Sequence, residues 1–342
     1  MHMADALISP AVGGTMWAVT TGLIGYSSTK VSRLADDRTI PLMGVLGAFV
    51  FAAQMINFAI PGTGSSGHLG GGLLLAILLG PWAALLTLAS ILTVQALFFA
   101  DGGILALGCN IFNMGVFPCL LAYPFLYKPF AGPGPHRRRI LAAAILASVA
   151  GLQLGAFSVV LQTTLSGIAD LPLVTFALFM QPIHLAIGLI EGVTTAAIVL
   201  FLHHSRPELI SHPGGLTNGG GRGSNSLTVL ILASVITAGL LSWFASSRPD
   251  GLEWSIERTA GTEEIAQPQS PLHASIRWLQ DRSAILPDYG FKKLPAGKEP
   301  LSPPPALQQK TETSVAGLVG GLLTLLTAAL MGLLLKRRGR VA

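Results

Sequence analysis

The sequence predicts an all-α, polytopic membrane protein with a small aqueous portion. Only 11% of its 342 residues are Asp, Glu, Lys or Arg, whereas ordinary soluble domains carry roughly 25%. Hydrophobic residues make up 51% of the chain, and its mean hydropathy is +0.62. These values exclude a large soluble enzyme, which needs a charged surface, and a disordered chain, which needs low hydrophobicity and high charge.

The positions of the charges divide the chain into three parts. The segment 247–313 holds 9 acidic and 8 basic residues, which is the composition of a soluble insert. The 246 residues before it hold only 7 acidic and 9 basic residues, and the last 29 hold four basic residues and no acidic one. We therefore expect two membrane blocks on either side of an aqueous segment.

Eight long apolar stretches supply the membrane helices. Each reaches or nearly reaches the ~20 residues that cross a hydrocarbon layer of ~30 Å. Gly80-Pro81 interrupts the third stretch, which therefore contains two helices and either crosses twice or re-enters. This gives seven helices in residues 1–203 and two more near the C-terminus. The stretches lie at about 10–28, 40–59, 69–99, 104–127, 140–165, 172–202, 227–246 and 314–335.

Four basic clusters orient these helices, because cytoplasmic loops carry an excess of Lys and Arg. With all four in the cytoplasm, the N-terminus, the 57–70 and 166–171 connections and the segment 247–313 lie outside, and the C-terminus lies inside. The clusters are Lys30/Arg33/Arg38, Lys128/Arg137/Arg138/Arg139, Arg206/Arg222 and Lys336/Arg337/Arg338/Arg340.

A Gly-rich stretch at 211–226 predicts a flexible cytoplasmic linker. It separates a domain at 1–210 from a module at 227–342, whose helices at 227–246 and 314–335 flank the extracytoplasmic segment 247–313. The start of the chain has no basic region of the kind that begins a cleavable signal, so we expect Met1 to stay the N-terminal residue.

The opening pair Met1-His2 is a candidate metal-binding group. The α-amine, the amide nitrogen of His2 and its Nδ1 can chelate one ion with rings of five and six members, and planar nitrogen coordination suits Ni²⁺ and Cu²⁺. His68, in a Gly- and Ser-rich outer loop, is placed to supply the fourth nitrogen. The alternative is that both histidines are incidental residues of a surface terminus and a flexible loop.

Polar residues in or near the membrane helices have two interpretations. His184 and Glu191 lie seven residues apart on one helical face, and ionisable residues at membrane depth are costly and commonly functional. They form either a structural pair or a part of the substrate path or of the coupling interface. Further candidates for residues that support the metal ligands or line the substrate path are Asp5, Asn57, Ser65, Ser66, Asn110 and Asn113. Gln54, Gln95, Gln153 and Gln181 are expected to form hydrogen bonds between helices.

Three stretches resemble the NikM/CbiM family, the substrate-binding membrane subunits of energy-coupling-factor (ECF) transporters for nickel and cobalt. They are the start Met1–Pro10, the loop Gly67–Gly71 and the helix residues Gln181–Gly192. Residues 227–342, with the sequence PDGLEW at Pro249–Trp254, resemble a fused NikN-type auxiliary subunit. The resemblance implies a seven-helix bundle like that of ECF substrate-binding (S) components.

The resemblance also implies a four-nitrogen site made by the Met1 amine, the His2 amide and imidazole, and the His68 imidazole. Ni²⁺ is favoured over Co²⁺, and the metal is the transported substrate; no cofactor is expected. The implied partners are a transmembrane coupling (T) subunit and cytoplasmic ATPase subunits, with no nucleic acid. The implied location is the cell membrane of a bacterium or archaeon.

Two other functions fit the sequence less well than metal import. The chain has no P-loop motif, so ATP hydrolysis is expected in a partner. An intramembrane metal-dependent enzyme using His184 and Glu191 lacks three ligands and a general base. A channel or ion-coupled transporter is disfavoured because no inverted repeat is visible. The choice between nickel and cobalt, and the role of 247–313, stay open in the sequence.

Overall fold

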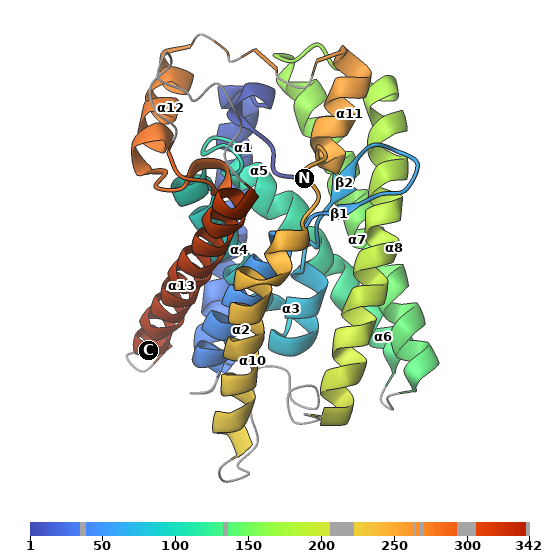
Figure 1. The fold of residues 1–342 in the computed structure, drawn as a ribbon, viewed down its shortest axis with the longest axis vertical. Helices are drawn as coiled ribbons and strands as arrows, with labels where there is room; N and C mark the ends of the chain where they lie inside the picture. Colours follow the sequence, from blue (N-terminus) through green and yellow to red (C-terminus); the bar gives the residue numbers. More distant parts are fainter. Residues whose placement is uncertain are drawn as a thin grey trace.

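The computed structural model describes residues 1–34, 39–132, 136–205, 222–262, 265–266, 268, 270–292 and 306–339. Most of the long helices run along one direction as a bundle, the last long helix crosses them obliquely, and short helices from the C-terminal part cover one end (Figure 1). The apolar core is made by the inner faces of these long helices. The expected all-α membrane fold is confirmed.

The first 205 residues contain the seven helices that the sequence predicts. Six helices of the described chain are long and apolar enough to cross a membrane, four of them here and two in the C-terminal module; α2 is apolar but shorter. The seven are α1 (Pro10–Leu34), α2 (Thr39–Gln54), α3 (Gly72–Leu79), α4 (Pro81–Val94) continuing as η2 (Gln95–Phe99), the rod of α5 (Leu107–Ile111), η3 (Phe112–Tyr127) and α6 (Lys128–Ala131), α7 (Arg137–Ser166) and α8 (Leu173–Ser205).

The predicted break in the third apolar stretch is present at Gly80, where φ is +80° and Pro81 begins α4. Helix α3 has eight residues, so it is about 12 Å long. It is therefore too short to cross a ~30 Å layer by itself. The chain before α3 consequently lies within the thickness of the bundle.

A short hairpin precedes α3, with β1 (Phe58–Ala59) antiparallel to β2 (Ser66–Gly67). The turn into the helix passes through Gly71, which has a φ of +73°. A Cβ at Gly71 would lie 2.4 Å from Val50 Cγ1 of α2. Both the conformation and the lack of space require glycine here, so the loop that contains His68 is tightly seated on the bundle.

The C-terminal module differs from the prediction at its helix ends. Helix α10 (Arg222–Gly239) begins five residues before the predicted start at 227, so the last residues of the predicted linker are helical, and residues 206–221 lie outside the described chain. Helix α13 (Ala306–Gly339) begins eight residues before 314, because Gln, Lys and Glu are good helix formers. Between them lie η4 (Leu241–Phe244), α11 (Gly251–Ala260), α12 (Pro271–Ser283) and η5 (Pro287–Tyr289).

Small residues bring the module against the first domain. A Cβ at Gly44 of α2 would lie 3.1 Å from the carbonyl oxygen of Leu325, and one at Gly320 of α13 would meet the ring of Phe51 at 2.0 Å. Helix α10 also packs on α2. The two module helices are therefore part of the same bundle.

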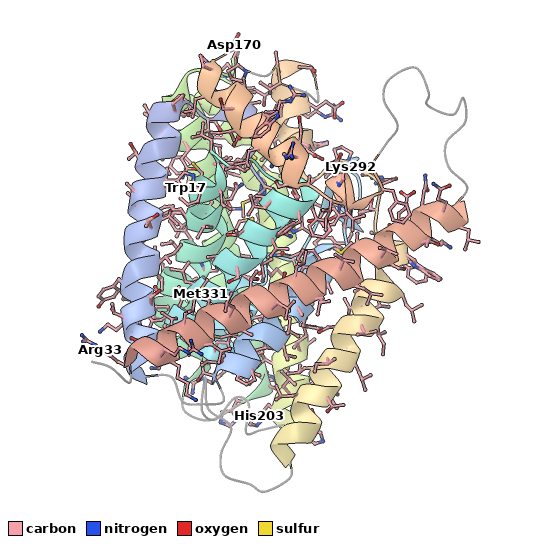
Figure 2. The ribbon with its side chains drawn as sticks, turned by 90° about the vertical axis from the view of Figure 1, so that its left-hand side faces the viewer. Trp17, Arg33, Asp170, His203, Lys292 and Met331 are labelled. Carbon is pink, nitrogen blue, oxygen red and sulfur yellow. The ribbon has the colours of Figure 1, made fainter. Side chains whose placement is uncertain are left out.

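The two ends of the bundle match the predicted separation of the loops. Arg33 and His203, at the C-terminal ends of α1 and α8, lie at one end, and Asp170 lies at the other (Figure 2). Helices α11 and α12 cover the end that contains Asp170 (Figures 1 and 2). The relative placement thus agrees with the positive-inside assignment, and which end faces the cell exterior stays a prediction.

The contact between α7 and α8 gives a first prediction. A Cβ at Gly192 would lie 2.5 Å from the Cα of Ile145, so Gly192→Ala must push the helices apart, and we expect it to lower the free energy of unfolding by about 1–3 kcal/mol. Gly25→Ala is the control, because no atom lies within 4 Å of the added Cβ. Thermal unfolding in detergent measures both, and equal midpoints for the two variants would contradict the close contact.

Candidate metal centre

The N-terminal segment is buried inside the bundle. Met1 is 7% exposed, and Met3 and Ile8 are completely buried. Asn110 of α5 binds both backbone groups of Met3, since its Oδ1 accepts from the amide nitrogen (2.8 Å) and its Nδ2 donates to the carbonyl oxygen (3.1 Å). Asn113 Nδ2 lies 3.5 Å from Met3 Sδ. Both asparagines therefore hold Met3, the residue that directly follows the candidate ligands Met1 and His2.

Asp5 performs a similar task one turn later. Its Oδ1 accepts a hydrogen bond of 2.9 Å from the amide of Ala106, and burial raises the pKa of this carboxyl group while the backbone bonds from residues 104–106 lower it. Asp5 thus supports the N-terminal segment, because its carboxylate accepts hydrogen bonds from the backbone of residues 104–106.

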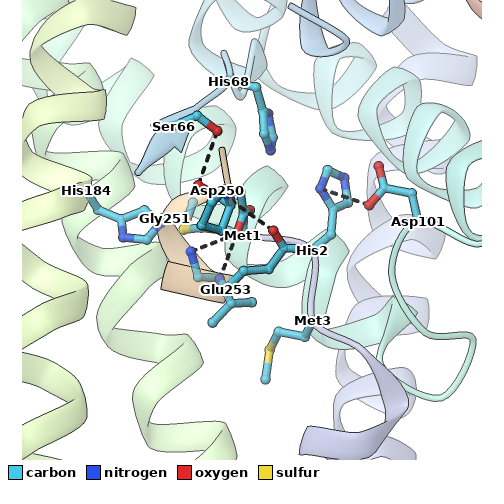
Figure 3. Close-up of polar contacts among 12 residues, drawn as sticks. Met1, His2, Met3, Ser66, His68, Asp101, His184, Asp250, Gly251 and Glu253 are labelled. Carbon is cyan, nitrogen blue, oxygen red and sulfur yellow. Dashed lines mark hydrogen bonds and ion pairs between the residues drawn. The ribbon is translucent and has the colours of Figure 1, made fainter. Parts of the chain in front are cut away.

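The imidazoles of His2 and His68 lie next to each other above Met1 (Figure 3). Their ring centroids are 5.2 Å apart, and the planes are tilted by 30°. His68 Nδ1 is 3.1 Å from the carbonyl oxygen of Leu69, which can only accept, so Nδ1 carries the hydrogen and Nε2 keeps its lone pair. The structure therefore brings together the three residues proposed from the sequence.

A carboxylate from the module meets the N-terminus. Asp250 Oδ2 lies 3.1 Å from the α-amine of Met1, and its Oδ1 accepts from the amides of Leu252 and Glu253 at the start of α11. Glu253 completes a capping box by accepting from the amide of Asp250. Asp250 is not among the candidate residues predicted from the sequence, where its only signal is its place in the PDGLEW stretch.

The hairpin before α3 holds this part of the module in place. Ser66 donates through its amide to the carbonyl of Pro249 (2.8 Å) and through its hydroxyl to that of Arg248 (2.7 Å). Trp254 Nε1 donates to the carbonyl of Thr63 (3.0 Å). Ser65 and Asn57 take part through weaker or backbone contacts, with Ser65 Oγ 3.4 Å from the Pro249 carbonyl and the Asn57 carbonyl accepting from Ser246.

His184 and Glu191 have different partners, although they share a face of α8. His184 Nδ1 is bonded to the Met180 carbonyl (2.8 Å), and its ring lies beside Gly251 and lines a narrow cavity of about 10 Å³ with Met1, His68 and Asp250. The carboxylate of Glu191 accepts from the amides of Gly70 (2.8 Å) and Gly71 (3.1 Å). Glu191 therefore holds the loop that bears His68.

The electrostatics of the centre favour a neutral imidazole beside an ion pair. Burial, and then the charge of the N-terminal amine, lower the pKa of His68 to about 4. Burial alone would raise the pKa of Asp250, but the ammonium group 3.1 Å away holds it well below its usual range. At neutral pH His68 thus keeps a lone pair for a metal, and Asp250 is ionised.

No cluster of three or more His, Cys, Asp or Glu side chains in the described ranges is arranged to hold a metal ion. The candidate centre is of another kind, because only His2 and His68 contribute side chains to it. The other two nitrogens are the amine of Met1 and the backbone amide of His2, which are groups that every N-terminus possesses. Such a set depends on the first two residues being held in place, as they are here.

The family of the chain follows from a comparison with known proteins. The model of the family described as the cobalt uptake substrate-specific transmembrane region, CbiM, matches residues 2–209. The chain belongs to the CbiM family. A second model, that of the PDGLE domain, matches residues 224–337, which is the part of this CbiM-family chain that carries Asp250.

Relatives share both the sequence and the fold. A protein of Archaeoglobus fulgidus, named as a fused nickel transport protein NikMN, is 30% identical over the full length of both chains. The cobalt transport protein CbiM of Geobacter sulfurreducens is 30% identical and covers 80% of this chain and 81% of its own. A crystal structure of a truncated transition metal transporter has 32% identity and a TM-score of 0.53, covering 60% of this chain and 99% of its own.

Membership of the CbiM family, together with the six long apolar helices among the described residues, identifies a multi-pass membrane protein of metal uptake. The resemblance seen in the sequence is thereby confirmed for both parts of the chain. The relatives are metal transporters, and none of the names above is that of an enzyme.

The contact between Glu191 and the loop gives a second prediction. Glu191→Ala removes the acceptors of Gly70 and Gly71, so we expect these two amides to exchange hydrogen with solvent roughly five- to tenfold faster. Glu191→Gln keeps one acceptor oxygen and should give an intermediate rate. Hydrogen exchange followed by mass spectrometry on peptides covering residues 66–75 measures this, and unchanged exchange in the alanine variant would show that the loop is held by other contacts.

Proposed function

We propose that this chain is the substrate-binding transmembrane component of an ATP-driven, ECF-type importer for Ni²⁺. The metal is captured in a four-nitrogen site formed by the amine of Met1, the amide and Nδ1 of His2, and the imidazole of His68. The single observation that carries the proposal is that the structure buries the Met1 amine beside two adjacent imidazoles from distant parts of the sequence.

The chemistry of the donors supports a late divalent metal. Amine, amide and imidazole nitrogens lie in one plane when they chelate, which Ni²⁺ and Cu²⁺ prefer and which hard ions such as Mg²⁺ do not. His68 Nε2 keeps its lone pair because Nδ1 is used by the Leu69 carbonyl. The fourth corner of the plane therefore belongs to His68.

Metal capture must change the contact with Asp250. The amine cannot bind a metal while it keeps the proton that it shares with Asp250 Oδ2. When the amine and the His2 amide each lose a proton to the solvent, the dication and one amidate leave a single positive charge in the site. Asp250 then faces this charge in place of the ammonium, so the net charge of the buried site is the same before and after the metal binds.

Two kinds of support favour nickel over cobalt as the transported metal. The relative that matches the full length of the chain is named for nickel transport, and a planar nitrogen set suits Ni²⁺. Cobalt import is the second candidate, because the family model and the Geobacter sulfurreducens relative are named for cobalt.

The energy for transport comes from partners in this proposal. The described part of the chain is occupied by membrane helices and by the short helices of the module, and its sequence has no P-loop motif. A transmembrane coupling subunit and cytoplasmic ATPase subunits supply ATP hydrolysis. The N-terminus and segment 247–313 face the exterior, where the metal is captured, and the C-terminus faces the cytoplasm.

A nickel titration of the purified full chain with a native Met1 tests the site. His68→Ala removes one of four ligands, and an extension of three residues moves the amine away from His2. We expect either change to weaken Ni²⁺ binding by more than about a hundredfold, beyond the usual cost of changing a group that only supports a ligand.

The matched control is His136→Ala, since His136 is exposed at the other end of the bundle, before α7. It should bind Ni²⁺ as the unchanged chain does. Isothermal titration calorimetry measures all four proteins, and full affinity in the His68→Ala or extended chain would contradict the site.

Transport is tested in sealed vesicles with radioactive Ni²⁺. The chain alone should exchange bound metal without accumulating it, because it has no source of energy. Addition of the coupling and ATPase subunits with ATP should produce accumulation. Sustained accumulation by the chain alone, driven by a proton or sodium gradient, would instead show a secondary transporter.

A further inference from the structure

Two buried glutamines connect His2 to the loop that bears His68. Gln54 Nε2 donates to the carbonyl oxygen of Gly70 (2.9 Å), and Gln95 Nε2 donates to Gln54 Oε1 (2.9 Å). His2 Nε2 lies 3.1 Å from Gln95 Oε1. Gln54 is 5% and Gln95 1% exposed, so bulk water does not compete for these bonds.

The Gly70 carbonyl determines which group donates in each of these three linked hydrogen bonds. A carbonyl oxygen only accepts, so Gln54 must turn its NH₂ group toward Gly70 and its oxygen toward Gln95. Gln95 must then donate to that oxygen and turn its own oxygen toward His2. The orientation of a side-chain amide is usually assigned from its neighbours, and here each neighbour allows only one choice.

The last bond decides which ring nitrogen of His2 is free. Because Gln95 Oε1 only accepts, His2 Nε2 must carry a hydrogen. The neutral ring then has its lone pair on Nδ1. Nδ1 is the nitrogen that closes a six-membered chelate ring with the amide of His2, whereas Nε2 lies on the far side of the imidazole.

We infer that Gln54 and Gln95 are positioning residues that hold hydrogen on His2 Nε2 and so present Nδ1 to the metal. The inference rests on the proposed function, since it concerns the same site. Groups that bind the second nitrogen of a metal-binding histidine commonly set its tautomer and its ring orientation. Here the same bonds also hold Gly70, two residues after His68.

Asp101 completes the surroundings of His2 on its other side. Its Oδ1 lies 3.5 Å from His2 Nδ1, which is longer than a good hydrogen bond, and its Oδ2 accepts from the hydroxyl of Tyr289 in the module. Nδ1 therefore faces a carboxylate that attracts a cation (Figure 3). The alternative is that the two glutamines only join α2 to η2 through a hydrogen bond between helices, as expected from the sequence.

The tautomer of His2 separates these two roles. The full chain with a native Met1 is labelled with ¹⁵N-histidine, and its nitrogen shifts are measured without metal at mildly alkaline pH. The His2 signals are those that vanish in His2→Ala. We expect hydrogen on Nε2 in the unchanged chain and a mixture of tautomers in Gln95→Leu, because leucine cannot accept.

Nickel affinity is the second measurement. Gln95→Leu should bind Ni²⁺ about 10- to 100-fold more weakly, and Gln54→Leu should also bind more weakly because Gln95 is then free to turn. The matched control is Gln153→Leu, which removes a partly buried hydrogen bond of 2.8 Å from the Gln153 side-chain amide to the Gln181 carbonyl, between α7 and α8. It should leave both the tautomer and the affinity unchanged.

Hydrogen on Nδ1 of His2 in the unchanged chain would overturn the inference, even if that chain binds nickel as proposed. Unchanged binding by Gln95→Leu would also overturn it, as would an equal loss in Gln153→Leu. If Gln95→Leu does not fold, the inference is tested by the His2 tautomer in the unchanged chain and by the Ni²⁺ affinity of Gln54→Leu. A chain that does not bind nickel through its N-terminus would overturn the proposed site and the inference together.

Discussion

The protein buries its own N-terminal amine, and the rest of the structure depends on this constraint. A charged amine inside a membrane bundle is costly unless it is paired. Its partner is Asp250, 249 residues later in the chain and 3.1 Å away. The module that carries Asp250 therefore supplies the partner of the buried amine, and its α10 and α13 helices pack on the same bundle. One ion pair links the first domain, the module and the position of the candidate metal ligands.

The loop that contains His68 is arranged around the same point. Because α3 has only eight residues, the chain before it stays within the bundle, near the depth of Met1. Glu191 holds the loop from one side and Gln54 from the other, both through Gly70. A site made of backbone nitrogens and two imidazoles has few side chains of its own, so its geometry must come from such supporting bonds.

Much of the architecture could be predicted because it follows from local patterns. The lengths of the apolar stretches predicted the helices, and Gly80-Pro81 predicted the break between α3 and α4. The proximity of Met1, His2 and His68 was also expected, from chelate chemistry and the family resemblance. The pairing of Asp250 with the Met1 amine was not expected, because a contact between residues 249 positions apart leaves no periodic pattern in the sequence. The roles of Gln54 and Gln95 depend on which neighbour each amide group faces, and only the assembled structure determines that.

X-ray absorption at the nickel edge, on the purified full chain with a native Met1 and one equivalent of Ni²⁺, tests the central claim most directly. The account predicts four nitrogen ligands in a plane, with no sulfur ligand from Met1, Met3 or the buried Cys109 and Cys119. A six-coordinate, oxygen-rich nickel ion, or one bound by sulfur, would contradict it.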